Sequence, residues 1–189
     1  MVYAAFLTGF LAQPVFAGPE SNAEQQLKTA VGLVAAFMKD QTLDGETRRS
    51  KVMDVINSAF DFPLIAKLTL GKRDWPKFNR EQKKEFVQLF TRQLENTYYS
   101  ETDFFAENTI QFEQPVRKKR KIEILTKISQ KEVELLYKLY NSRGKWRIYD
   151  VEIQGVSLIS SFRAQYRQFL KTGTIEEFLE KIREKVNSK

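Results

Sequence analysis

Two of the side-chain types that most often perform chemistry in proteins are absent from this chain. The 189 residues include no His and no Cys. Without His, the chain lacks the commonest general base and metal ligand, and it cannot form a Ser-His-Asp triad. Without Cys, disulfides, thiol catalysis, thiolate metal sites and a bacterial lipoprotein anchor are excluded. Catalysis by Asp, Glu, Lys or Tyr alone stays open.

The acidic residues that could act as catalysts have ordinary spacing. Asp150 and Glu152 share one face of a predicted strand, as acidic pairs do in many solvated strands. The sequence shows neither a Gly-rich phosphate loop nor a cluster of metal ligands. One enzyme class remains as an alternative, a small-molecule isomerase or dehydratase in an open, cone-shaped fold. It would require Asp150 to lie deep in a cavity with a raised pKa.

A basic run, Arg117–Lys121, stands out in a chain of net charge +7 and pI about 9.5. Such an excess indicates an anionic partner: a nucleic acid, an anionic membrane surface or an acidic protein patch. The run follows Pro115 and enters a predicted strand, so Lys119 and Lys121 are expected on its solvent face. It is either a solvated strand end or a docking patch for anionic head groups or an acidic partner. We expect no nucleic-acid partner.

The first segment has the pattern of a secretory signal peptide. Val2–Phe16 carry no charge, and Val15-Phe16-Ala17 fits a signal-peptidase site, although no Lys or Arg precedes Lys28. The apolar run is shorter than the about 20 residues that span a membrane. The alternative is a buried N-terminal helix. We expect 1–17 to be removed, which leaves a single exported domain, 18–189, without a membrane anchor.

Hydrophobic periodicity places helices at both ends of the mature chain and strands in the middle. Asp44 and Asn79 precede helical stripes as N-caps, and Thr174-x-x-Glu177 is a capping-box pattern. Apolar residues alternate with charged ones between Ile110 and Ile153. We predict helices over 22–38, 44–60, 64–70 (ending at Gly71), 79–98, 157–170 and 174–186. The fold class is α+β, with about four antiparallel strands packed against several helices.

Aromatic residues are abundant, with 15 Phe, 7 Tyr and 2 Trp. Some strand positions are apolar on both faces, such as Leu135 and Leu136, although a sheet with one solvated face should alternate. The surplus has two interpretations. Aromatic stripes are usually plain core, but they could also line a cavity that accepts hydrocarbon. Composition leaves both open.

Two stretches carry a family resemblance. Residues 60–100 contain Phe-Asp-Phe, a short helix, Leu-Gly, a Trp, and a Phe-rich helix that contains Gln and ends in Tyr. Residues 144–182 contain Trp-x-x-Tyr-Asp-Val, Gly-Val-Ser-Leu, a helix with Arg and Gln, and Lys-x-Gly. In order and spacing they resemble the MlaC family, also called the toluene-tolerance family. The chain departs from it in Ile159-Ser160-Ser161, where an Asn- or Thr-rich stretch is usual, and in its stronger basic run.

The resemblance implies a soluble periplasmic phospholipid-binding protein, an auxiliary component of an ABC transporter. Its fold would be similar to the nuclear-transport-factor-like fold, with an apolar cavity between sheet and helices. Members shuttle phospholipid between an outer-membrane lipoprotein complex and an inner-membrane ABC transporter complex with a lipid-binding ring, which maintains outer-membrane lipid asymmetry. We therefore expect a monomeric carrier, not an enzyme, with a phospholipid as cargo and no cofactor or metal.

On this basis we expect the lipid tails to lie against the long helix, the sheet and the helix that follows it. The expected lipid-binding residues are Phe86, Phe90, Leu94, Tyr98, Tyr137, Leu139, Trp146, Ile148, Val156, Leu158, Phe162 and Tyr166. Arg163 and Arg167 are either neighbours of the phosphate or plain surface residues. Each buried methylene contributes about 0.8 kcal/mol, so two chains of about 16 carbons would gain up to roughly 25 kcal/mol relative to water.

Overall fold

The computed structural model describes residues 18–99, 108–129 and 132–188, so the expected signal peptide, 1–17, lies outside it. Helical segments are α1 (Pro19–Lys39), α2 (Gly45–Ala59), α3 (Phe62–Asp74), the short 3₁₀ helix η1 (Trp75–Lys77), α4 (Arg80–Tyr98), α6 (Leu158–Phe169) and α7 (Ile175–Asn187). Strands are β1 (Ile110–Phe112), β2 (Val116–Lys118), β3 (Lys121–Ile128), β4 (Val133–Ser142), β5 (Lys145–Ile153) and β6 (Val156–Ser157). The α+β class is confirmed.

The predicted helix caps are confirmed. The Asp44 carboxylate accepts a hydrogen bond from the backbone N–H of Thr47 at 2.8 Å. Asn79 forms a reciprocal capping box with Gln82 at the start of α4, and Thr174 opens α7 in the same way. These bonds satisfy N–H groups that have no partner within the helix. Local sequence therefore decides where these helices begin.

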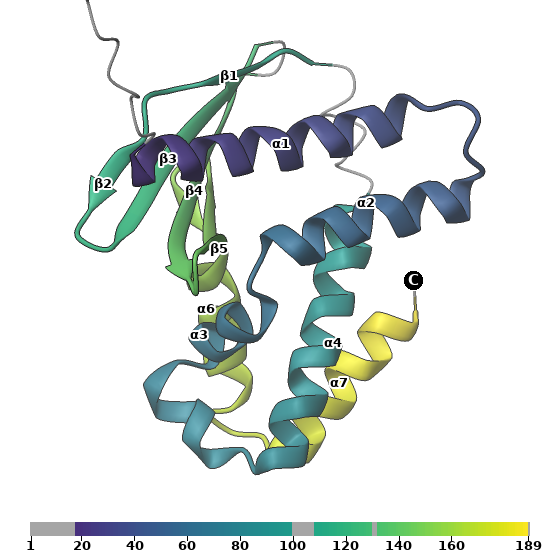
Figure 1. Cartoon of the computed structure of the whole chain (residues 1–189). Coiled ribbons are helices and arrows are strands. Elements are labelled where there is room, and N and C mark those ends of the chain that lie inside the picture. The colour runs from purple at the N-terminus through teal and green to yellow at the C-terminus, as the bar shows by residue number, and fades with distance from the viewer. Residues whose placement is uncertain (1–17, 100–107, 130–131, 189) are drawn as a thin grey trace, which may run out of the picture.

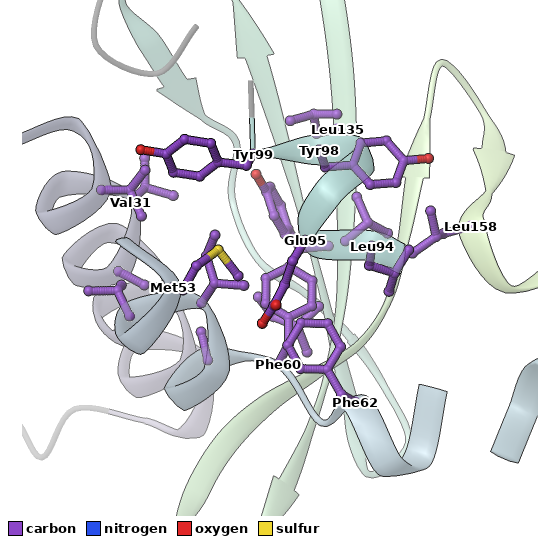
Figure 2. A pocket seen from close by; sticks show the side chains of 18 of the residues that line it. Val31, Met53, Phe60, Phe62, Leu94, Glu95, Tyr98, Tyr99, Leu135 and Leu158 are labelled. Carbon is purple, nitrogen blue, oxygen red and sulfur yellow. The ribbon is translucent and has the colours of Figure 1, made fainter. Parts of the chain in front are cut away.

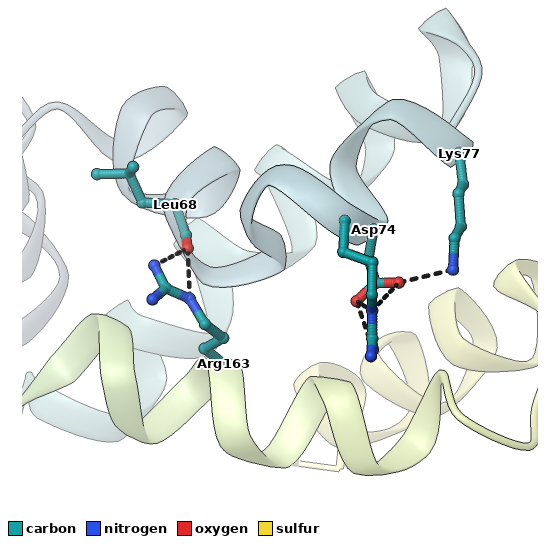
Figure 3. A network of polar contacts seen from close by, with 5 residues as sticks. Leu68, Asp74, Lys77 and Arg163 are labelled. Atoms are coloured by element: carbon teal, nitrogen blue, oxygen red, sulfur yellow. Dashed lines mark hydrogen bonds and ion pairs between the residues drawn. The ribbon is translucent and has the colours of Figure 1, made fainter.

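The helix predicted to stop at Gly71 is interrupted there by a kink, and a second helical stretch continues from the kink to Asp74. Gly71 has φ 70° and ψ −174°, a combination that is essentially restricted to glycine. The kink removes helical hydrogen bonds, and the Arg163 side chain replaces one of them. Its Nε and Nη2 both donate to the Leu68 carbonyl, at 3.1 and 2.6 Å (Figure 3).

Within the described residues, the sheet has six antiparallel strands in the order β1-β3-β4-β5-β6, with β2 also pairing with β3. The prediction of about four strands was therefore low. The additional strands, β2 and β6, contain only three and two residues and lie at the sheet edges. Segments this short show no alternation, and charged residues occupy most of β2, so no periodicity signal marked them.

A bulge in β5 decides which side chains share a sheet face. Lys138 pairs with Asp150, but the next residue of β4, Leu139, pairs with Ile148, so Tyr149 is an extra residue in β5. A bulge shifts the alternation by one position. As a result Ile148 and Val151 both point to the face that carries Leu139. In a regular strand, two residues separated by an odd number of positions would point to opposite faces.

Helix α1 lies across that face of the sheet, and α2 runs back antiparallel to it (Figure 1). On the β5–β6 side of the sheet, α3, α4, α6 and α7 form a second layer of packed helices, with α4 beside α7 and α3 beside α6 (Figure 1). Among the described residues, no helix is both long and apolar enough to cross a membrane.

The helical layer has a solid aromatic core. Phe86, Phe90, Phe162, Tyr166 and Phe178 interlock, with ring centroids between 5.1 Å for Tyr166–Phe178 and 6.3 Å for Phe90–Tyr166. Many of the contacts are edge-to-face, the arrangement that the ring quadrupole favours. This core confirms the plain-core interpretation for most of the predicted aromatic stripes.

Candidate functional site: an apolar pocket

A pocket of about 570 Å³ lies between α1, α2, the end of α4 and the inner sheet face. That volume is within the range of small-molecule and cofactor sites. Its described walls are formed by Leu27, Ala30, Val31, Val34, Met53, Val55, Ile56, Ala59, Phe60, Phe62, Leu94, Glu95, Thr97, Tyr98, Tyr99, Val133, Leu135, Tyr137, Ile148, Val151, Ile153 and Leu158. Figure 2 shows side chains from α1, α2, α4 and the sheet turned toward one space. The expected apolar cavity between sheet and helices is therefore present.

Helix α1 forms the roof because it is longer than the sheet is wide. Its 21 residues extend about 30 Å, whereas neighbouring strands are only about 4.8 Å apart. Ala23 and Leu27, near its start, are buried against the sheet. Leu27 also borders the pocket, and further along Ala30 and Val31 line it. The beginning of α1 is thus packed on the sheet, and its middle covers a space.

The wall formed by α2 consists of two large apolar side chains and one small one. Met53 and Ile56 face the pocket, and Ala59 at the end of the helix leaves room in front of the sheet. Phe60 then stacks on Phe62 with centroids 5.6 Å apart. The chain is held in this path because the Asp61 backbone N–H donates to the Ile148 carbonyl at 2.9 Å.

The sheet supplies the floor. Leu135 and Tyr137 on β4 pair directly with Ile153 and Val151 on β5. The bulge at Tyr149 allows Ile148 to join the same floor. The apolar side chains at these paired positions form a continuous hydrocarbon surface. Exposing this surface to water would be energetically costly.

Few polar groups interrupt these walls. Among the described wall residues, Glu95 is the single charged side chain, and Figure 2 shows it extending from α4 toward Phe60. Tyr137 is buried, and this burial raises the pKa of its phenol far above the ordinary value, so the hydroxyl stays neutral. Such a site is suited to hydrocarbon and poorly suited to a strongly hydrated ligand.

The structure brings some of the sequence-predicted site residues to this pocket and not others. Leu94, Tyr98, Tyr137, Ile148 and Leu158 line it. The remaining predicted residues lie elsewhere: Phe86, Phe90, Phe162 and Tyr166 in the aromatic core, Leu139 and Trp146 in the packed part of the α1–sheet interface, and Val156 at 60% exposure on the surface. The physical reason is that α6 and the first part of α4 pack against each other rather than against the sheet floor.

Sequence reasoning missed the walls from α1 and α2. Their residues include Val31, Val34, Met53, Ile56 and Ala59. The apolar stripe of α1 was predicted, but a stripe that covers a cavity has the same period as one that covers a filled core. The available signal was side-chain size, since Ala and Val at successive inward positions fill less space than Leu or Phe.

Asp150 is buried but lies outside the pocket walls. Its carboxylate accepts hydrogen bonds from the Ser157 hydroxyl at 2.7 Å and from the Ile159 N–H at 3.2 Å, at the start of α6. Lys138 Nζ is 3.8 Å from it. These contacts make it a structural residue that fixes α6 on β5, on the sheet face opposite the floor.

The two arginines of α6 also have settled positions. Arg163 is bonded to the Leu68 carbonyl, as described above, so it is a structural residue at the kink of α3. Arg167 is exposed. Within the described ranges, no group of three or more Asp or Glu residues is placed to hold a metal ion.

Comparisons with known proteins agree with this geometry. The family model described as MlaC protein matches residues 28–184. Among solved structures, the chain is similar to a phospholipid-binding protein from Ralstonia solanacearum that was solved in complex with a phospholipid. The TM-score is 0.75 at 22% identity, over 88% of this chain and 98% of that one, which shows a shared fold. No curated protein matches the sequence.

Proposed function

This chain belongs to the MlaC family, and from that premise we propose that it is a carrier that binds a phospholipid through its acyl chains. The observation that carries the proposal is the pocket of about 570 Å³ whose described walls hold one charged side chain, Glu95. The bound phospholipid of the Ralstonia solanacearum structure, which shares the fold, supports the same ligand class.

The tails would lie along the floor of Leu135, Tyr137 and Ile148, beneath the roof of Val31 and beside Met53. Each methylene moved from water into such a site contributes about 0.8 kcal/mol, so one chain of about 16 carbons contributes up to about 13 kcal/mol. Spontaneous loss of the lipid to water is then negligible. Release requires a second apolar site that contacts the pocket.

The head group would stay at the mouth. Burying a phosphate among these walls would remove its hydration and offer few donors in return. Tyr98, at 36% exposure, lies on the wall and at the surface at once, so it marks a side of the mouth. The pocket would therefore discriminate among acyl chains more than among head groups.

The cellular route follows from family membership and the leader pattern. In this proposal residues 1–17 are removed on export, and residues 18–189 act as one monomeric domain in the periplasm. The domain would collect or deliver phospholipid at an outer-membrane lipoprotein complex and at an inner-membrane ABC transporter complex with a lipid-binding ring. That exchange would maintain outer-membrane lipid asymmetry.

A carrier fits the site better than the isomerase or dehydratase alternative does. That alternative needs a carboxylate deep in the cavity, and its candidate, Asp150, is instead hydrogen-bonded to the start of α6. Glu95 lines the pocket, but the sequence offers no His or Cys to work with it. The proposed activity is therefore transport without covalent chemistry.

Native mass spectrometry of the mature protein purified from cells, followed by lipid extraction, tests the proposal. We expect a phospholipid adduct on the wild type and its loss in the double variant Ala30→Phe/Ala59→Phe, whose rings would fill the pocket. Ala36→Phe is the matched control, because Ala36 is exposed on α1 and does not line the pocket. A wild type free of lipid that also takes none up from vesicles would overturn the proposal.

A further inference from the structure

Two hairpin tips that are separate in the sequence form one basic surface in the fold. The β2–β3 tip carries the run Arg117–Lys121, and the β4–β5 tip carries Arg143 and Lys145. Strand register places them at the same end of the sheet, because Lys121 pairs with both Lys118 and Tyr140, and Lys145 pairs with Ser142. We call these seven exposed residues the hairpin-tip patch: Arg117, Lys118, Lys119, Arg120, Lys121, Arg143 and Lys145.

The patch holds as many cations as the net positive charge of the whole protein. The chain has 31 Lys and Arg residues and 24 Asp and Glu residues. Removing the 7 patch residues from the 31 leaves 24, which balances the acids. The remainder of the chain is thus neutral as a whole, whereas the seven cations of the patch lie together at one end of the sheet.

Little negative charge opposes the patch. Among the described residues, Arg117 is the one patch member with an ion pair, to Glu20 at 3.2 Å. The Lys121 ammonium lies over the Tyr149 ring, 4.1 Å from its centroid. Glu123, which pairs with Val116, is the acidic neighbour on β3. The patch therefore projects most of its charge into solvent.

The backbone conformation of both hairpin tips favours residues other than Lys and Arg. Lys119 has φ 61° and Arg143 has φ 52°, a left-handed conformation in which Gly and Asn are preferred. Long basic side chains at both tips therefore carry a conformational cost, which Glu132 and Gln154 also carry at turns outside the patch. A binding role for these charges would offset that cost.

We propose that the hairpin-tip patch docks the carrier on the surface of a membrane that contains anionic phospholipid. The patch has the number of cations typical of polybasic membrane-binding clusters. None of its seven members is aromatic, unlike the centre of a typical protein–protein interface, and the exposed apolar residue beside it is Val116, at 49%. A diffuse negative surface matches such projecting, flexible cations better than a shaped protein partner does.

Docking by the patch leaves the pocket free. β4 runs 10 residues, about 30 Å, from Ser142 beside the patch to Val133 on the pocket wall. The tips would hold the protein at the membrane while the mouth remains open to another partner. This inference rests on the proposed function for its purpose, but the binding itself does not require a loaded pocket.

Flotation with lipid vesicles tests the proposal. Wild type should float with vesicles of phosphatidylcholine and phosphatidylglycerol and not with phosphatidylcholine alone, and salt should reverse it. Each cation near an anionic surface contributes about five-fold in affinity, so Lys118→Ala/Lys119→Gly/Arg120→Ala should lose roughly 100-fold. Gly suits the backbone at position 119, so the turn should still form. Lys72→Ala/Arg92→Ala/Lys171→Ala removes the same charge from exposed sites elsewhere.

Each outcome of the flotation experiment either supports or overturns the proposal. Selective loss in the patch variant, with normal binding by the control, supports the proposal. Equal losses in both variants would mean that net charge and not the patch binds, and would overturn it. Failure of the wild type to float would also overturn it, and binding to polyglutamate in that case would assign the patch to an acidic protein. Lipid extracted from the same samples reports separately on the proposed function.

Discussion

The aromatic core between α4, α6 and α7 and the pocket between α1, α2 and the sheet are both apolar, yet one is solid and the other is hollow. In the core, flat rings interlock, as between Phe90 and Phe162 at 5.3 Å. In the pocket, α1 overhangs the sheet, and the small side chains of Ala30 and Val31 line a space. Apolar composition therefore indicates burial, while helix length and side-chain size decide whether the buried space is filled.

The largest expected effect tests that contrast directly. Phe86→Ala removes a fully buried ring from the solid core and should lower the free energy of unfolding by about 3–5 kcal/mol. Phe60→Ala removes a half-buried ring from the pocket wall. In lipid-free protein it should lower the free energy of unfolding by less than half as much, because this ring already borders the empty space of the pocket. Urea unfolding of both delipidated variants measures the difference. Equal losses would mean that the pocket is as tightly packed as the core.

Asp74, at the end of α3, forms ion pairs with Arg73 and Lys77. Burial raises the pKa of the Asp74 carboxyl, but hydrogen bonds from Arg73 and Lys77 outweigh burial and hold its pKa below the ordinary 3.8 (Figure 3). Because the folded-state pKa is lowered, this stabilisation is present above about pH 4 and is lost as the pH falls through the lowered value.

Asp74→Asn should therefore cost about 1–2 kcal/mol at neutral pH, since it keeps the shape of the side chain but removes the charge. The difference from wild type should shrink below about pH 4. Denaturant unfolding at several pH values measures it, and lipid content should not change because Asp74 does not line the pocket. A difference that stays constant to acidic pH would contradict the assigned role.

The smallest expected effect concerns the pocket. Glu95 places a carboxylate where hydrocarbon should lie, so Glu95→Leu should retain lipid about tenfold longer in competition with empty vesicles, a change of about 1.4 kcal/mol. Glu184→Leu, at an exposed position of α7, is the matched control. Faster loss of lipid from the Glu95 variant would instead indicate that the carboxylate holds the cargo.

Features with local causes could be predicted from the sequence. Caps at Asp44, Asn79 and Thr174 follow from side chains that bond to nearby N–H groups. The long strands follow from period-two alternation. Edge strands of two or three residues escaped prediction because such segments have no period.

Features with non-local causes could not be predicted in this way. The pocket depends on the length of α1 relative to the sheet, and its floor depends on the bulge at Tyr149. The hairpin-tip patch depends on strand register, which joins Arg143 to a basic run far away in the sequence. Family resemblance supplied the fold and the cavity, while the expected lining residues followed the aromatic stripes, most of which belong to the solid core.

Photo-crosslinking tests the central claim most directly. The mature protein would be loaded with a phospholipid that carries a diazirine in one acyl chain, irradiated, digested and analysed by mass spectrometry. The account predicts crosslinks at pocket residues such as Val31, Met53 and Ile56, and none at Phe86 or Phe178 in the solid core. Crosslinks concentrated at the core aromatics, with the α1 and α2 walls unlabelled, would contradict it.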